Sequence, residues 1–208
     1  MIWSDTISDG PPESCQEQNF VGPLVLLAKA RTAGEPFILL SRACVFNISL
    51  PLPRHEDGRR DGQEVAGKCL RAAEEAVLAY PKGMVVRVEH LVADIPAIVA
   101  AAEASKGPIE DLCLTPVSPE AVEYLCGLLC ALSSPPHKIF HLIGAVAVRL
   151  SELVYRKTAG REEFSPIFEA RRRGWLVDSR IPKVLGPEGA AELGRIDRYF
   201  AKATLFRA

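Results

Sequence analysis

The segment between Lys82 and Leu132 alternates between strand-forming and helix-forming residues, and this alternation constrains the fold more than any other feature of the chain. β-Branched residues dominate 84–92, an alanine-rich run follows Asp94, 109–114 is apolar again, and 118–132 has a helical composition. Strands and helices that alternate at this spacing form a parallel sheet covered by helices. We therefore predict an α/β protein with a mostly parallel sheet flanked by helices.

The loop Thr115–Glu120 is the predicted ligand-binding segment, because ligands of such sheets bind where a strand leads into a helix. Its composition does not suit phosphate. Pro116 and Pro119 lack the backbone N–H groups that cradle a phosphate, and Glu120 adds a negative charge. The chain also contains no Gly-x-Gly-x-x-Gly and no Gly-Lys-Ser/Thr phosphate loop.

Outside this segment the sequence predicts a leader, a polar loop and further helices and strands. Residues 1–22 are poor in apolar side chains, which indicates a flexible leader, and the charged, glycine-containing stretch 54–62 indicates an exposed loop. We predict strands at 24–30 and 37–40, a hairpin over 138–150 with Gly144 near its turn, and a short hairpin within 175–185. We predict helices at 63–80, with Arg71, Glu74 and Glu75 facing water, at 164–174, and from Pro187 to Phe200.

Charge and cysteine usage limit the classes of function. The segment from Arg156 to the C-terminus has twelve basic and seven acidic residues, although the whole chain has a net charge of −1. A basic tail indicates either nucleic-acid contact or a solvated, arginine-rich helix. The six cysteines form no Cys-x-x-Cys pair, so we predict that they are buried as small apolar residues. Zinc binding with His137 or His141, or a disulfide, is the alternative. No secretory signal is evident, so we expect a cytoplasmic protein.

The tail resembles part of a winged helix-turn-helix module. It contains a run Arg-Arg-Arg-Gly-Trp-Leu-Val and then Leu-Gly-Pro-Glu-Gly. The resemblance implies a basic recognition helix, a wing and a final helix, and it makes DNA a possible partner. The residues that it implies for DNA contact are Arg171, Arg172, Arg173, Arg180 and Lys183. A small subdomain used for dimer packing is the alternative.

The order of elements before the tail resembles the CARF domain, the CRISPR-associated Rossmann fold. The similarity covers a cysteine-bearing helix, the strand 85–92, a capped helix and an apolar strand that enters a polar loop. It implies a Rossmann-like domain over 23–155, followed by a winged-helix-like tail over 156–208, in a homodimer that binds a cyclic oligoadenylate. By position in the family, the implied ligand-binding residues are Lys29, Arg31, Thr32, Thr115 and Ser118.

These observations together predict a non-enzymatic regulator or sensor of CRISPR-type antiviral defence, without a metal or cofactor. One alternative is a small phosphodiester-cleaving nuclease of the same fold, in which His90 is the acid–base group because it ends a strand beside Asp94. The other alternative is a structural subunit whose basic tail docks onto a nucleoprotein complex.

Overall fold

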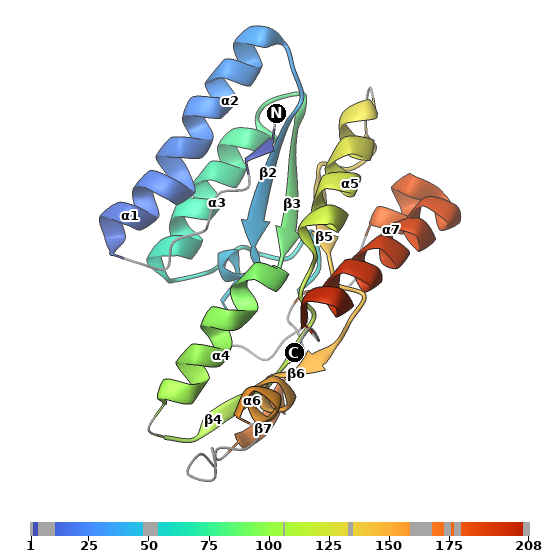
Figure 1. Ribbon diagram of the computed structural model, residues 1–208. Coiled ribbons are helices and arrows are strands. Elements are labelled where there is room, and N and C mark those ends of the chain that lie inside the picture. Colours follow the sequence, from blue (N-terminus) through green and yellow to red (C-terminus); the bar gives the residue numbers. More distant parts are fainter. Residues whose placement is uncertain are drawn as a thin grey trace.

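The main body of the protein is a four-stranded parallel sheet with helices on both faces (Figure 1). The computed structural model describes residues 2–3, 11–47, 54–105, 107–132, 135–158, 168–172, 176 and 180–205. The strand order is β1 (Ile2–Trp3), β2 (Phe37–Arg42), β3 (Gly83–Val88) and β5 (Ile139–Leu142). The predicted α/β class, a Rossmann-like parallel sheet flanked by helices, is therefore confirmed.

The two faces of this sheet bury different helices, because successive side chains of a strand point to opposite sides. On one face Phe37, Leu39 and Val85 pack against α2 (Gly22–Ala33) and α3 (Val65–Leu78). On the other face the alternate side chains pack against α5 (Pro119–Ala131) and α7 (Ile181–Leu205). All six residues of β3 are buried, as expected for a strand covered on both faces.

The N-terminal part of the chain is helical, which corrects two predictions. Residues 12–21, predicted as leader, form α1 (Pro12–Gln16) and a π-helical turn (Glu17–Val21) that continues into α2. The strand predicted at 24–30 lies within α2, because Leu27 and Ala30 recur at a helical spacing and are buried against the sheet. The end of α2 is fixed by Gly34, whose φ of 66° suits glycine.

A smaller lobe lies beyond the main sheet (Figure 1). Here β4 (Ile109–Leu114) pairs in parallel with β7 (Phe168–Arg172) and antiparallel with β6 (Val148–Arg149). Apolar residues of α4 (Ile95–Ala104) and α6 (Leu150–Thr158) pack beside it. The predicted hairpin over 138–150 is therefore wrong, because β5 belongs to the main sheet and β6 to the small one.

The winged-helix arrangement predicted for the tail is not confirmed. Residues 168–172, predicted as helix, form β7, and residues 181–185, predicted as part of a hairpin, form the start of α7. The helix predicted from Pro187 is confirmed: non-helical dihedrals at Gly186 break α7, and the helix continues through Phe200 to Leu205. None of the helices in the described part of the chain has the length and apolar composition to cross a membrane.

The described cysteines are free thiols. Cys15 and Cys126 are buried and the other four are partly buried, so the prediction of small apolar side chains is confirmed for these two. Burial raises the pKa of Cys126 to about 12, which keeps it protonated. No group of three His, Cys, Asp or Glu side chains among the described residues is placed to hold a metal ion.

A buried ion pair joins α3 to the centre of the main sheet. Arg87 on β3 and Glu74 on α3 are both fully buried, and Arg87 Nε and Nη2 donate to the two carboxylate oxygens over 2.9 and 2.7 Å. Arg87 Nη1 donates to the carbonyl oxygen of Glu56 over 3.1 Å and lies 3.3 Å from His141 Nε2. The prediction that Glu74 faces water is wrong, because its helix turns this residue toward Arg87.

We expect Glu74→Gln to lower the free energy of unfolding by about 3–5 kcal/mol, because it leaves the Arg87 guanidinium buried without a counter-charge. Urea denaturation at pH 7 measures this change. The matched control is Glu123→Gln, an exposed residue of α5, for which we expect a change within about 0.5 kcal/mol. Equal effects of the two substitutions would contradict a structural role for the Arg87–Glu74 pair.

Candidate functional site

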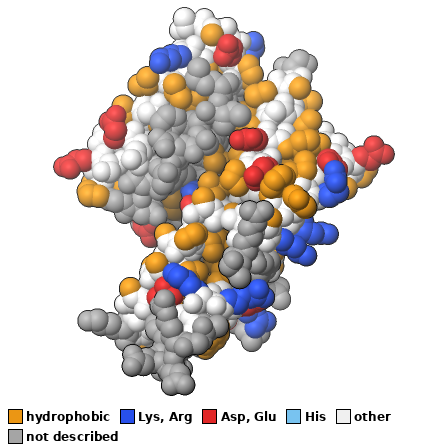
Figure 2. Space-filling model, in the orientation of Figure 1, with side chains coloured by type: hydrophobic (Ala, Val, Ile, Leu, Met, Phe, Trp, Pro, Cys, Tyr) orange, Lys and Arg blue, Asp and Glu red, His pale blue; other side chains and the backbone are white. Residues whose placement is uncertain are grey.

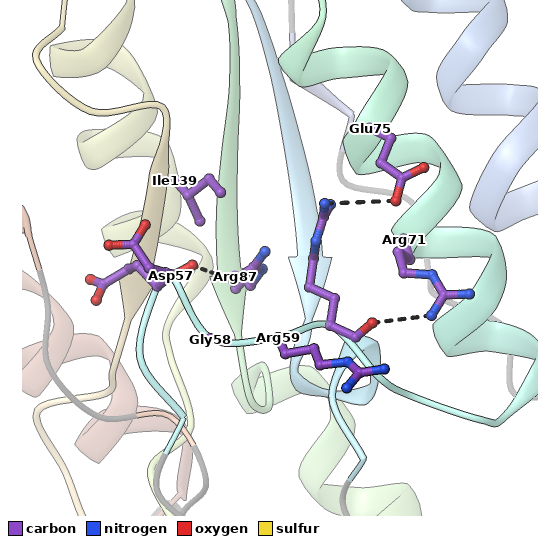
Figure 3. A pocket seen from close by; sticks show the side chains of 9 residues that line it. Asp57, Gly58, Arg59, Arg71, Glu75, Arg87 and Ile139 are labelled. Atoms are coloured by element: carbon purple, nitrogen blue, oxygen red, sulfur yellow. Dashed lines mark hydrogen bonds and ion pairs between the residues drawn. The ribbon is translucent and has the colours of Figure 1, made fainter.

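A cavity of about 420 Å³ opens between α3 and the segment 56–60, over β3 and β5 (Figure 3). Arg71 and Glu75 project from α3 on one side, Asp57 lies on the other, and Arg87 and Ile139 lie between them (Figure 3). The side chains around this cavity are mostly charged; the lining residues are Glu56, Asp57, Gly58, Arg59, Arg60, Arg71, Glu75, Arg87 and Ile139. We refer to this cavity as the arginine pocket.

Close backbone contacts place the 56–60 segment beside the sheet. A Cβ atom on either Gly62 or Gly67 would collide with the carbonyl oxygen of Cys44, so both positions require glycine for the chain to return this tightly after β2. The Gly58 N–H donates to the His55 carbonyl oxygen over 2.9 Å and closes a turn. The pocket therefore depends on the long connection between β2 and α3, which the sequence predicts only as an exposed polar loop.

Glu56 attaches this segment to the edge of the main sheet. Its side chain is only 3% exposed, and Oε1 accepts hydrogen bonds from the backbone N–H of His141 over 3.4 Å and of Arg180 over 2.8 Å. Asp57 forms an ion pair with the Arg180 guanidinium. The pocket wall is thereby connected to the residue that leads into α7.

Two of the four pocket arginines have carboxylate partners. Arg87 is paired with Glu74, and Arg60 lies 3.2 Å from Glu74 Oε2 and 3.7 Å from Glu75 Oε1. The Arg87 guanidinium also lies over the Phe46 ring, 5.0 Å from its centroid. These two arginines are therefore structural, with their charge neutralised inside the protein.

The other two arginines, Arg59 and Arg71, form no ion pair with a carboxylate among the residues that the structure describes. Arg71 Nη1 donates to the Arg60 carbonyl oxygen over 3.1 Å, which leaves its other donors for a ligand. The hydrogen bond from the Asn47 N–H, and then the charges of Arg54 and Arg59, lower the pKa of Asp61. Arg59 itself is exposed. The pocket thus offers two guanidinium groups to an anion.

The ligand-binding residues predicted from the sequence lie at opposite ends of the main sheet. Lys29, Arg31 and Thr32 are exposed on α2, at the amino end of the strands, where Lys82 Nζ donates to the Gly34 carbonyl oxygen. Arg31 lies over the Tyr80 ring, and the Thr32 hydroxyl donates to the Ala28 carbonyl oxygen within its own helix. Thr115 and Ser118 lie at the carboxyl end, so the structure does not bring the five residues together.

The predicted ligand loop Thr115–Glu120 is filled by the protein's own side chains. Ser118 is 1% exposed, and its hydroxyl caps α5 by accepting from the Ala121 N–H over 3.2 Å. Asp197 of α7 is 3% exposed; its two carboxylate oxygens accept from the backbone N–H groups of Ser118 over 2.7 Å and of Ala145 over 2.6 Å. An internal carboxylate therefore occupies the helix N-terminus where an anionic ligand would bind in a Rossmann-like sheet.

The residues predicted to contact DNA are divided between two parts of the fold. Arg171 and Arg172 belong to β7 of the small sheet, Arg173 lies outside the described residues, and Arg180 is paired with Asp57 beside the arginine pocket. Lys183 is exposed at the start of α7. Basic and apolar side chains are exposed together over α7 (Figure 2), including Arg195, Arg198, Tyr199 and Lys202. DNA binding stays a prediction.

A second polar cluster lies at the carboxyl ends of β2 and β3. Arg42 forms an ion pair with Asp94, and the Thr115 hydroxyl lies 3.4 Å from Glu89 Oε2. Burial alone would raise the pKa of Asp94, but the hydrogen bond and charge of Arg42 and the Leu91 N–H hold it below its ordinary value. Burial, and then the positive charge of Arg42, lower the pKa of His90 to about 4. His90 is therefore neutral at pH 7.

Comparison with known proteins identifies the fold and no family. No family model and no curated protein matches the sequence. Among solved structures, WbmH of Bordetella bronchiseptica in complex with NAD+ is similar over 96% of this chain and 75% of its own, with a TM-score of 0.65 and 15% identity. WbmG of the same organism, in complex with NAD and UDP, has a TM-score of 0.62 and 13% identity over 95% of this chain and 71% of its own. dTDP-4-dehydrorhamnose reductase of Bacillus anthracis, in complex with NADP, has a TM-score of 0.61 and 13% identity over 89% and 72%.

These similarities correct the resemblance proposed from the sequence. The matched structures are enzymes such as this reductase and UDP-galactose 4-epimerase, so the CARF assignment and the expected role in CRISPR-type antiviral defence are wrong. Element order misled the prediction because a Rossmann-like order of strands and helices is shared by proteins of many functions. At these identities the matches show the fold alone.

We expect His90→Gln to weaken the acid dependence of stability. In the unfolded chain a histidine has a pKa of about 6.5, whereas His90 in the folded protein has a pKa of about 4. The unfolded state therefore gains the proton first, and stability is lost as the pH falls from about 6.5 toward 4. Between pH 7 and pH 5 the wild type should lose about 1–2 kcal/mol more than the variant in urea denaturation. An identical loss in both proteins would contradict the lowered pKa.

Proposed function

We propose that this protein binds a phosphate-bearing ligand in the arginine pocket. The observation that carries the proposal is that Arg59 and Arg71 line the cavity without a carboxylate partner among the described residues, whereas Arg60 and Arg87 are neutralised by Glu74 and Glu75. A guanidinium group presents planar, paired donors that match phosphate oxygens, and it stays charged at every physiological pH.

The size and location of the cavity support this proposal. A volume of about 420 Å³ falls within the range of about 300–1,000 Å³ of small-molecule sites. Arg87 is the fifth residue of β3, so the pocket lies toward the carboxyl half of the strands, on the face that α3 covers. Because the chain has no glycine-rich phosphate loop, the phosphate would be held by side chains instead of backbone N–H groups.

The ligands of similar structures are consistent with a phosphate-bearing ligand. The three matched structures described above contain NADP, NAD+, and NAD together with UDP, and each of these molecules contains a diphosphate. This similarity of fold supports the class of ligand and not a particular activity. A homodimer, predicted from the sequence, stays a prediction.

We expect Arg59→Ala and Arg71→Ala each to weaken the binding of pyrophosphate about tenfold or more, because a hydrogen bond to a charged group contributes about 1.5–3 kcal/mol. Isothermal titration calorimetry at low ionic strength measures the affinity, which should fall as salt is added. Arg195→Ala, which removes an exposed arginine on α7, is the matched control and should bind as the wild type does. No binding of pyrophosphate to the wild type at millimolar concentration, or equal affinity in all three variants, would overturn the proposal.

A further inference from the structure

We infer that the ligand of the arginine pocket is a sugar phosphate, with its phosphate at Arg59 and Arg71 and its hydroxyl groups at Glu75 and Asp57. This inference rests on the proposed function, because it assumes that the phosphate is held by the two arginines. The other residues that line the pocket determine which chemical groups the rest of the ligand carries.

The lining favours a sugar over a nucleobase. A base gains affinity by stacking on an aromatic or apolar surface, which contributes about 1–3 kcal/mol per base where aromatic rings are present. Ile139 is the one apolar side chain among the described residues that line the pocket, and none of them is aromatic. A polyhydroxylated ring needs hydrogen-bond acceptors instead, and the lining provides them.

Glu75 is the acceptor best placed for a hydroxyl group. It lies one helical turn after Arg71 on the same face of α3, so a ligand held by Arg71 passes beside it. Its side chain is 60% exposed, and its contact with Arg60 is a long one of 3.7 Å. An ionised carboxylate accepts hydrogen bonds through two oxygens and can therefore accept from two neighbouring hydroxyl groups.

Asp57 provides a second carboxylate on the opposite side of the pocket (Figure 3). Its Oδ2 atom accepts from Arg180, and Oδ1 can accept a hydrogen bond from a hydroxyl group of the ligand. Asp57 and Glu75 lie on opposite sides of the pocket, and each disfavours a second phosphate beside it, because like charges repel. The pocket thus combines two guanidinium groups for a phosphate with carboxylates on two sides for neutral, hydroxyl-bearing groups.

The test compares four probes by isothermal titration calorimetry: methyl phosphate, glucose 1-phosphate, ribose 5-phosphate and AMP. We expect the tighter of the two sugar phosphates to bind at least tenfold more tightly than methyl phosphate. AMP carries the same phosphate and ribose hydroxyl groups as ribose 5-phosphate and should bind no more tightly than that sugar phosphate, because none of the described lining residues is aromatic and the base gains no stacking contact. Glu75→Gln should reduce the ratio of the affinity for this sugar phosphate to the affinity for methyl phosphate at least fivefold. The same variant should bind methyl phosphate equally or more tightly, since a negative charge beside Arg71 is removed.

Glu123→Gln, on the surface of α5, is the matched control and should leave all four affinities unchanged. If methyl phosphate binds through Arg59 and Arg71 but neither sugar phosphate binds more tightly, or if AMP binds most tightly, the sugar inference is overturned and the proposed function stands. If neither methyl phosphate nor pyrophosphate binds, both are overturned. If Glu75→Gln weakens the affinity for all four probes by the same factor, a role of Glu75 specific to the sugar is also contradicted.

Discussion

The buried ion pair between Arg87 and Glu74 is the interaction on which the arginine pocket depends. A guanidinium group in the centre of a parallel sheet must have its charge and its donors satisfied, and here α3 supplies the carboxylate, Glu56 a carbonyl oxygen and Phe46 an aromatic face. Satisfying Arg87 therefore fixes α3, the 56–60 segment and the sheet relative to one another. The cavity lies where α3, the 56–60 segment and the sheet meet.

The same pairing determines which charges remain for a ligand. Glu74 also accepts from Arg60, and Glu75 lies 3.7 Å from Arg60, so two of the four pocket arginines are paired with carboxylates of α3. Arg59 and Arg71 are the two that are left. At the carboxyl end of the sheet the N–H groups of Ser118 and Ala145 are not left for a ligand, because both already donate to Asp197. These two arrangements together explain why the candidate site lies on the α3 face of the sheet and not in the loop after β4.

Much of the fold could be predicted from the sequence, but little of the candidate site. Local signals were sufficient for β3, α3, α4 and α5, because residue composition acts within a few residues. They failed for α2, which is buried against the sheet, and for β7, which pairs with the distant strand β4. The sequence does contain one signal for the site, because Arg87 interrupts a run of β-branched residues. A charged residue in a strand that is buried on both faces requires a buried partner of opposite charge.

The central claim is that the phosphate site of this Rossmann-like protein is the arginine pocket, while Asp197 occupies the usual position at the carboxyl ends of the strands. A crystal structure of the full chain with pyrophosphate tests this claim most directly. The account predicts electron density for the anion between the guanidinium groups of Arg59 and Arg71, with Asp197 still bound to Ser118 and Ala145. Density for the anion at the Ser118 and Ala145 N–H groups, with Asp197 displaced, would contradict it.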